Sequence, residues 1–448
     1  MKEVFLLVRP WYGVNIHTDA QGEYGTVLHS NDVFPDLPLL YAATMLDQSD
    51  DYDVLYIDAY TNRILPDELL RRIKEASFDK IIVKTTAASI KSDIELIRQI
   101  KANDPDSYVM TAGHAAKDLK SWIDANTDID EVIEEPLDKF IYRYVHGEDG
   151  TVNDLPTPDY SLVDYKRYTD DLGRVRLTVQ ASRGCPMNCA YCPYIRFYDK
   201  YEPRDVDHIM EDVRSLASLG AEVIQFRDQF FTCDRKKVRE LCSRMIEENI
   251  KVSWICETKL DSLDEELIDI MKQAELFMVC FGIESGDQTT MDSYNSNKGS
   301  LAKQQATVAL LRSKGILTMA FYIIGFPEDT WDSVRDTYDY ANKIASDIVA
   351  FNEYTLFPFE RDEEFTPDVF FPFANATNVP VESNLTREEI RYVIDLFSAM
   401  YTADHDCLEK AYTFNHLISA QYKKTVALLA GCGNDLQKMS DAIRQMQR

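Results

Sequence analysis

Three cysteines stand close together in the segment Ala181-Ser182-Arg183-Gly184-Cys185-Pro186-Met187-Asn188-Cys189-Ala190-Tyr191-Cys192-Pro193-Tyr194. Their spacing is Cys-x3-Cys-x2-Cys, and the segment follows a predicted strand directly. Thiolates are the usual ligands of iron–sulfur clusters. Three thiolates on one loop leave the fourth iron of a cubane open to a small molecule. A structural zinc site is the alternative, but it needs four closed ligands, and the next Cys or His after this loop is the distant His208.

The chain around this loop alternates predicted strands and helices from about Arg174 onward. Alternation of this kind indicates βα units and a parallel sheet. Six such units favour a partial (β/α)6 TIM-like barrel, in which ligands lie at the carboxyl ends of the strands. The predicted strands are Val175–Gln180, Val223–Phe226, Val252–Ile255, Phe277–Phe281, Leu317–Ile324 and Ile348–Phe351.

The N-terminal part shows a second alternation, with five short apolar strands separated by amphipathic stretches. This pattern predicts an α/β, doubly wound domain of flavodoxin-like or Rossmann-like type. The proline-rich segment Asp154–Tyr160 predicts an extended connector. The expected domains are 1–150 (α/β), 151–172 (linker), 173–358 (barrel) and 359–448 (a mostly helical C-terminal extension, packed on or over the barrel mouth).

Composition restricts the kind of partner. The formal net charge of the 448-residue chain is −28, which disfavours binding to the phosphates of nucleic acid. Nine cysteines, an odd number without an export signal, argue against a disulfide framework. No apolar run is long enough to span a membrane, so a cytoplasmic protein is expected.

Beyond the cysteines, the sequence resembles the radical S-adenosylmethionine (SAM) superfamily over about residues 150–358. The resemblance continues at the predicted strand ends, in Phe226–Phe231, Trp254–Thr258, Phe281–Gly286 and Ile324–Thr330. It implies that Cys185, Cys189 and Cys192 bind a 4Fe–4S cluster. The Leu-Pro-x-Pro-Asp-Tyr connector and the preceding α/β domain resemble the subgroup with an N-terminal cobalamin (B12)-binding domain.

The same resemblance implies roles in SAM binding for residues beside or after the strands. Tyr191 is expected to lie against the adenine, and Asp228 to meet the SAM amino group. Glu284 and Ser285 are expected to contact the ribose or the methionine part. Gly325 would let the backbone approach the ligand.

Cobalamin is a further expected cofactor, although the motif Asp-x-His-x-x-Gly, whose His binds cobalt from below, is absent. The nearest approach is His17, in a predicted loop after the first strand. Gly113 and His114 follow the fourth strand at another ligand-facing loop, where Gly113 would allow close approach of a flat ring. Members of the subgroup often lack the lower His, so its absence leaves cobalamin binding open.

The resemblance implies a radical enzyme that cleaves SAM to a 5′-deoxyadenosyl radical and, with cobalamin, a C-methyltransferase on a natural product or peptide. A reductant such as flavodoxin or ferredoxin is the expected partner. One alternative is a peptide epimerase or rearrangement enzyme without cobalamin, in which Cys407 or Cys432 donates a hydrogen. Another is a cobalamin or redox sensor that binds without turnover.

Overall fold

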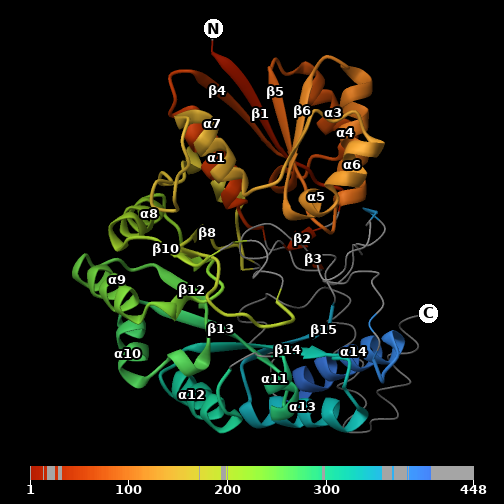
Figure 1. Ribbon diagram of the computed structural model, residues 1–448. Helices are drawn as coiled ribbons and strands as arrows, with labels where there is room; N and C mark the ends of the chain where they lie inside the picture. Colours follow the sequence, from red (N-terminus) through yellow and green to blue (C-terminus); the bar gives the residue numbers. More distant parts are fainter. Residues whose placement is uncertain are drawn as a thin grey trace.

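The computed structural model contains two parallel β-sheets, each wrapped by helices (Figure 1). It describes residues 2–13, 15–17, 26–28, 33–170, 172–192, 198, 200–294, 298–355, 366–367, 381 and 383–404. The first sheet lies in the N-terminal unit and the second lies in the unit that carries the three cysteines. The predicted α/β fold, with a doubly wound sheet followed by a partial barrel, is confirmed.

The N-terminal sheet has five parallel strands in the order β4-β1-β5-β6-β7. Its strands are β1 (Glu3–Arg9), β4 (Tyr52–Asp58), β5 (Lys80–Lys84), β6 (Tyr108–Ala112) and β7 (Glu131–Ile133). Alternate side chains of β1 face opposite layers, because Phe5 and Leu7 join one apolar cluster while Leu6 and Val8 join another. The strand order changes direction at β1, and in sheets of this type ligands bind beyond the carboxyl ends at such a point.

Helices cover both faces of this sheet (Figure 1). One face is covered by α1 (Leu37–Asp47) and α7 (Leu137–His146), whose apolar side chains pack with Phe5 and Leu7. The other is covered by α3 (Pro66–Glu75) and α4 (Ile90–Asn103). The remaining helices of the unit are short: α2 (Ala59–Asn62), α5 (His114–Asp118) and α6 (Lys120–Asn126).

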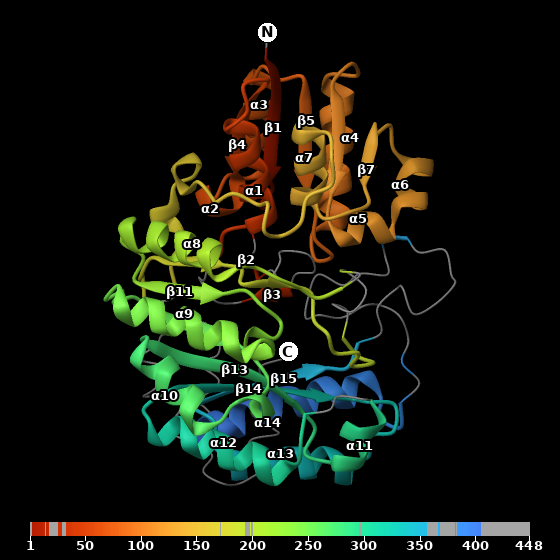
Figure 2. The same cartoon turned by 60° about the vertical axis from the view of Figure 1, so that its left-hand side comes forward.

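The second sheet is a six-stranded, all-parallel partial barrel in the order β15-β14-β13-β12-β11-β8. Its strands are β8 (Arg176–Val179), β11 (Val223–Phe226), β12 (Ser253–Glu257), β13 (Leu276–Glu284), β14 (Leu317–Ile324) and β15 (Ile348–Glu353). The helices are α8 (Val206–Ser218), α9 (Arg235–Glu247), α10 (Glu265–Gln273), α11 (Gln288–Ser293), α12 (Leu301–Ser313), α13 (Trp331–Ile344) and α14 (Arg387–Asp404). In Figure 2 most of these helices line the outer side of the sheet.

The barrel strands bury a different set of side chains on each face. Outward residues such as Phe226, Trp254 and Phe281 pack with the helices in the largest apolar cluster. Inward residues form a small separate cluster around Ile255 and Cys280. Because both faces are covered, the strands read as nearly continuous apolar runs, which is typical of parallel sheets.

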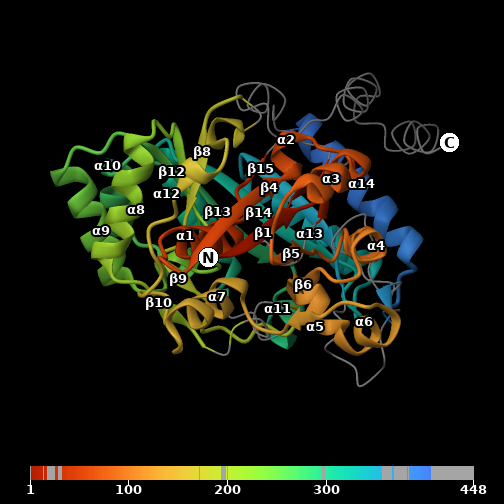
Figure 3. The same cartoon turned by 90° about the horizontal axis from the view of Figure 1, so that it is seen from above.

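The described part of the C-terminal segment is the helix α14, which packs on the outside of the barrel. Thr386 and Glu389 form a capping box at its start, since the Thr386 amide donates to Glu389 at 2.8 Å. Phe397 stacks on Tyr338 at 4.5 Å, and the Tyr401 hydroxyl donates to the carbonyl oxygen of Ser346. Its described turns therefore continue the outer helix layer after β15. In Figure 3, α14 and the α8–α10 group lie on opposite sides of the N-terminal unit.

Buried polar contacts join the two units at the carboxyl ends of β1 and β4. The Tyr168 hydroxyl donates to Asp58 at 2.6 Å, and Arg9 lies 3.8 Å from the same carboxylate. Arg9 also donates to the carbonyl oxygen of Phe34 at 2.6 Å. The Phe34 ring contacts the guanidinium of Arg176, 4.0 Å from its centroid. The carboxyl edge of the first sheet is thus fixed to the barrel.

Replacing Tyr168 by Phe is expected to lower the free energy of unfolding by about 1.5–3 kcal/mol, because a hydrogen bond to a buried carboxylate is lost. Urea unfolding measures the change. The control is Tyr165→Phe, whose partly buried hydroxyl donates only to the carbonyl oxygen of Leu219 at 3.3 Å. An equal loss of stability in both variants would contradict the importance of the Asp58 contact.

Several local features differ from the sequence predictions. The helix α7 follows the last strand of the N-terminal sheet and was not predicted. The last amphipathic stretch between the strands is divided at Leu119 into α5 and α6. His17 lies in a short strand, β2 (Asn15–His17), paired with β3 (Thr26–Leu28), where a loop was expected. Among the described residues, no helix is long and apolar enough to cross a membrane.

Candidate functional site

The three cysteines lie on the loop that follows β8, at the carboxyl edge of the barrel. Cys189 is 8% exposed, and Cys185 and Cys192 are partly buried. The Cys192 amide donates to the carbonyl oxygen of Cys189 at 3.0 Å, which folds this end of the loop into a turn. The Ala190 amide donates to the carbonyl oxygen of Tyr294, so the loop is also tied to the end of α11. None of the three cysteines forms a disulfide.

The donor chemistry of this loop suits an iron–sulfur cluster. Burial raises the pKa of the Cys185 thiol, with the neighbouring Cys189 adding to the effect. The metal-free thiol is therefore neutral, and cluster binding would release its proton. Within the described ranges, no three His, Cys, Asp or Glu side chains are gathered closely enough to hold a single metal ion, so a preformed zinc site is absent from that part of the chain.

Asp228 follows β11 and anchors the start of the cysteine loop. It is 1% exposed, and its carboxylate accepts hydrogen bonds from the Ala181 amide at 3.0 Å and the Ser182 hydroxyl at 2.6 Å. Burial raises the pKa of Asp228 to about 6, against the opposing effect of these hydrogen bonds. Both oxygens are thus engaged within the chain, so Asp228 positions the loop; its contact with the SAM amino group remains a prediction.

Asp228→Asn is expected to remove a pH dependence of stability. The fold raises this pKa from 3.8 to about 6, so the folded chain binds the proton more tightly than the unfolded chain. The resulting stabilisation, about 3 kcal/mol at most, is fully present below pH 4 and is lost as the pH rises through 6. Urea unfolding of both chains from pH 4 to 7 should show a difference that grows in favour of the wild type at low pH. A difference that is constant with pH would contradict this assignment.

Glu284 ends β13 and forms a buried ion pair with Lys298. The Lys298 ammonium lies 3.0 Å from the Glu284 carboxylate, and the side chains are 14% and 9% exposed. Burial lowers the pKa of Lys298, but Glu284 and the nearby Cys189 raise it more, so Lys298 stays protonated. Glu284 has φ 72°, and a Cβ atom at Gly282 would overlap its carboxylate. The left-handed backbone of Glu284 indicates a functional position, and a side chain at Gly282 would displace its ion pair.

Lys298 was missed by sequence reasoning. It follows α11 and is separated from Glu284 by that helix, so no local pattern connects the two residues. The available signal was a lone lysine in the connection that follows a barrel strand ending in Glu. Tyr191 lies near the same carboxylate; burial raises the pKa of the Tyr191 hydroxyl, and Glu284 raises it further. The structure therefore gathers Tyr191, Glu284 and Lys298 beside the cysteine loop.

Ser285 and Gly325 are each engaged by neighbours within the chain. The buried Ser285 hydroxyl accepts a hydrogen bond from the Asp287 amide at 3.0 Å. Gly325 has φ 94°, and a Cβ atom there would lie 2.6 Å from the Ile390 side chain on α14. The need for glycine at 325 is thus accounted for by its backbone conformation and by α14. Its contact with SAM remains a prediction, as does that of Ser285.

An aromatic group lies next to the cysteine loop, at the ends of β14 and β15. Phe326 contacts Tyr294 and Tyr354, with ring centroids 4.5 and 5.0 Å away. Tyr191 meets the edge of Phe326 at 6.2 Å. Phe326 and Tyr354 are buried, so these rings form a closely packed apolar group beside the loop.

Gly113 and His114 lie at the carboxyl edge of the N-terminal sheet, after β6. His114 is 5% exposed, and its ring centroid lies 6.1 Å from that of Tyr198, which follows the three cysteines in the chain. A Cβ atom at Gly113 would overlap the carbonyl oxygen of Thr85, so this glycine is needed for packing between two strand ends. The side chain of His17 and all of Cys407 and Cys432 lie outside the described residues.

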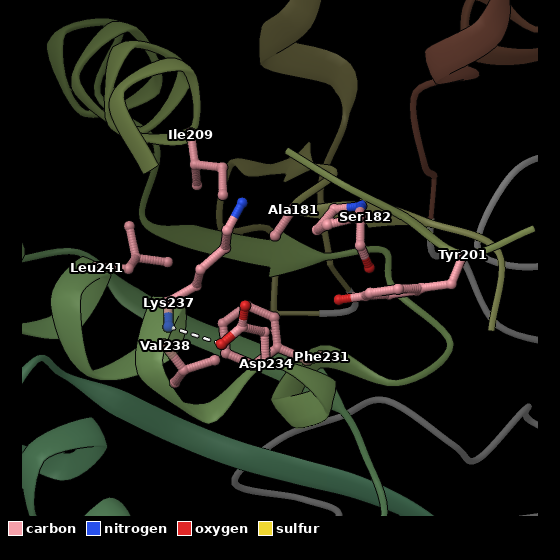
Figure 4. A pocket seen from close by; sticks show the side chains of 10 residues that line it. Ala181, Ser182, Tyr201, Ile209, Phe231, Asp234, Lys237, Val238 and Leu241 are labelled. Carbon is pink, nitrogen blue, oxygen red and sulfur yellow. Dashed lines mark hydrogen bonds between the residues drawn. The ribbon is translucent and has the colours of Figure 1, made fainter. Parts of the chain in front are cut away.

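A small open hollow lies on the helix side of β8 (Figure 4). Ser182 and Tyr201 form one wall, and Lys237 and Leu241 of α9 form another. The Lys237 ammonium is held by the carbonyl oxygen of Arg204 at 2.9 Å. Because the hollow borders the outer helices and none of the three cysteines lines it, we do not assign it to the reaction.

Comparison with known proteins identifies the barrel. Residues 179–341 match the Radical SAM superfamily. An uncharacterized methyltransferase of Pyrococcus horikoshii is 26% identical, over 74% of this chain and 78% of that protein. The anaerobic magnesium-protoporphyrin IX monomethyl ester cyclase of Cereibacter sphaeroides is 24% identical, over 68% of this chain and 56% of the cyclase.

Solved structures show the same fold over most of the chain. The radical SAM methyltransferase TsrM from Kitasatospora setae, with cobalamin and a 4Fe–4S cluster bound, superposes with a TM-score of 0.62 at 16% identity, over 79% of this chain and 72% of TsrM. The cobalamin-dependent SAM radical enzyme OxsB, with aqua-cobalamin and SAM bound, gives 0.61 at 14%, over 76% of this chain and 52% of OxsB. Residues 179–341 of the chain therefore form a radical SAM domain.

Proposed function

We propose that the chain is a cobalamin-dependent radical SAM C-methyltransferase acting on a small molecule or peptide. One observation carries the proposal: at the carboxyl edge of the N-terminal sheet, the His114 ring contacts Tyr198, which follows the three cysteines in the chain. A corrinoid at that edge and a SAM molecule at the barrel edge would face a common space. The folds of TsrM and OxsB, whose structures contain cobalamin, and the similarity to a methyltransferase support this function.

In this proposal, Cys185, Cys189 and Cys192 hold a 4Fe–4S cluster. The cluster, when bound, supplies the electron that cleaves SAM to methionine and a 5′-deoxyadenosyl radical. Beside the cluster, Glu284 offers a carboxylate and Lys298 an ammonium. SAM itself has an amino group and a carboxylate, which these side chains would contact. The loop is held in place by Asp228, and the aromatic group around Phe326 excludes water from the reacting atoms.

Cobalamin would lie against the ends of β5 and β6. Short side chains line that edge, where the Thr86 and Ser89 hydroxyls bond each other at 2.8 Å and Gly113 follows β6. Short side chains leave room for the face of a large flat ring to lie against the sheet edge. When bound, methylcobalamin supplies the methyl group. The His114 ring packs against Tyr198. We therefore propose that cobalamin binds without His114 as the lower ligand of its cobalt.

We further propose that the electron comes from a small carrier protein such as flavodoxin or ferredoxin, and that the protein works in the cytoplasm. A carrier protein of low reduction potential stays reduced only in a reducing compartment. A 4Fe–4S cluster with an open iron also stays intact only there. The absence of a spanning helix among the described residues agrees with this location.

Anaerobic purification with iron and hydroxocobalamin tests the corrinoid. The wild-type chain is expected to retain about one cobalamin, visible as corrinoid absorption bands, and to form S-adenosylhomocysteine when the cobalt is reduced in the presence of SAM. Iron without any corrinoid in the wild type would refute the methyltransferase and favour the epimerase or rearrangement enzyme.

A further inference from the structure

The chain enters and leaves the cysteine loop through a short pair of antiparallel strands, which we call the neck. The strands β9 (Ser182–Arg183) and β10 (Glu202–Pro203) pair antiparallel, with Arg183 opposite Glu202. The Arg204 amide donates to the carbonyl oxygen of Ala181 at 2.9 Å. Any movement of this neck would displace Cys185, which lies only two residues beyond Arg183.

Each side of the neck carries a buried arginine. Arg183 is 8% exposed, and its guanidinium forms an ion pair with Asp138. Arg204 is 1% exposed; it pairs with Asp212 at 2.5 Å and donates to the carbonyl oxygen of Gln180 at 2.9 Å. Buried guanidinium groups need such partners, because an unpaired buried charge is strongly destabilising.

The partner of Arg183 comes from the other unit of the protein. Asp138 is 0% exposed and lies in the first turn of α7, the helix that covers the N-terminal sheet together with α1. From α1, the Tyr41 hydroxyl lies 3.5 Å from the Arg204 guanidinium. A face of the proposed cobalamin unit thus supplies the charge that fixes the neck of the proposed cluster loop.

Two further contacts converge on the same place. The Arg183 guanidinium lies 5.5 Å from the centre of the Tyr198 ring, and Tyr198 in turn contacts His114 at the carboxyl edge of the N-terminal sheet. Arg183 is therefore held between α7 and a residue that itself touches the proposed cobalamin edge.

We propose that Asp138 is a positioning residue for the cluster: by holding Arg183 it sets the geometry of the loop that carries Cys185, Cys189 and Cys192. The N-terminal unit then contributes to cluster retention as well as to cobalamin binding. This inference rests on the proposed cluster site. It assigns a role in the barrel reaction to a residue that lies outside the radical SAM domain.

The test compares the wild type with Asp138→Asn in the full-length chain. Asn keeps the size of the side chain and removes its charge. We expect the reconstituted variant to lose iron to a chelator about tenfold faster. We also expect amide hydrogen exchange in peptides covering residues 181–192 to accelerate at least threefold, in the iron-free chain as well, while peptides covering β13 and β14 stay unchanged. Arg143→Gln is the matched control, since Arg143 lies on the exposed side of α7 and pairs with Glu135.

Asp138→Glu provides a second variant in case Asp138→Asn does not fold, because it keeps the charge but displaces it by one methylene. It should lose iron faster than the wild type. Wild-type iron loss and wild-type exchange in a folded Asp138 variant would overturn the proposal. If the wild type binds no iron, the cluster proposal fails by itself, and the exchange of residues 181–192 in the iron-free chains still decides whether Asp138 holds the loop.

Discussion

A chain in which Cys185, Cys189 and Cys192 are all replaced by alanine should contain no cluster. Iron is expected to fall from about four atoms per chain to background, because each of three irons loses its thiolate ligand. The formation of 5′-deoxyadenosine from SAM should fall by at least about a thousandfold, since the electron donor is gone. Iron analysis and product chromatography under anaerobic conditions measure both effects.

Cys242→Ala is the matched control for this experiment. Cys242 is fully buried in α9 and forms no disulfide, so its loss should cost about 1 kcal/mol of stability and leave the iron content unchanged. If the triple variant kept its iron, or if Cys242→Ala lost it, the ligand assignment would be wrong.

Lys298→Met should be the most destabilising single change at the site. It leaves the Glu284 carboxylate buried without its ammonium partner, and breaking a buried pair in this way typically costs about 3–5 kcal/mol. The double variant Glu284→Gln/Lys298→Met should recover part of the loss, with a coupling energy of about 1–3 kcal/mol. Urea unfolding of the four chains gives this cycle, and the KM for SAM should rise in each folded variant.

The exposed pair between Arg335 and Asp332 serves as the control. Its side chains are 65% and 80% exposed, and exposed pairs contribute little, so Arg335→Gln should change the unfolding free energy by less than about 0.5 kcal/mol. Additive effects of Glu284→Gln and Lys298→Met would show that the two side chains do not act as a pair.

The sequence was most informative about features that repeat locally. Parallel strands that are covered on both faces read as short apolar runs, so all eleven main strands of the two sheets lay close to predicted segments. The capping box at Thr386 and Glu389 was also predictable, because its two residues are neighbours along the chain. The cysteine loop was visible because its three candidate ligands lie within a few residues of one another.

Features that depend on distant contacts were not predictable. Asp138 was overlooked because no local pattern connects that residue with Arg183. Lys298 was overlooked for the same reason. The helix α7 itself was missed although it carries a local signal, with Leu137 and Ile141 on one buried face and Gly147 at its end. Asp228 was placed correctly at a strand end, but only the register of β8 beside β11 shows that its carboxylate accepts hydrogen bonds from Ala181 and Ser182.

Reductive cleavage of SAM by the reconstituted wild-type chain tests the central claim most directly. After anaerobic reconstitution with iron and sulfide, the chain is mixed with SAM and a strong reductant, and 5′-deoxyadenosine is measured against time. The proposed site predicts cluster absorption in the visible range and steady formation of 5′-deoxyadenosine, both absent when Cys185, Cys189 and Cys192 are replaced. A chain that carries a complete, reducible cluster and still leaves SAM intact would contradict the claim.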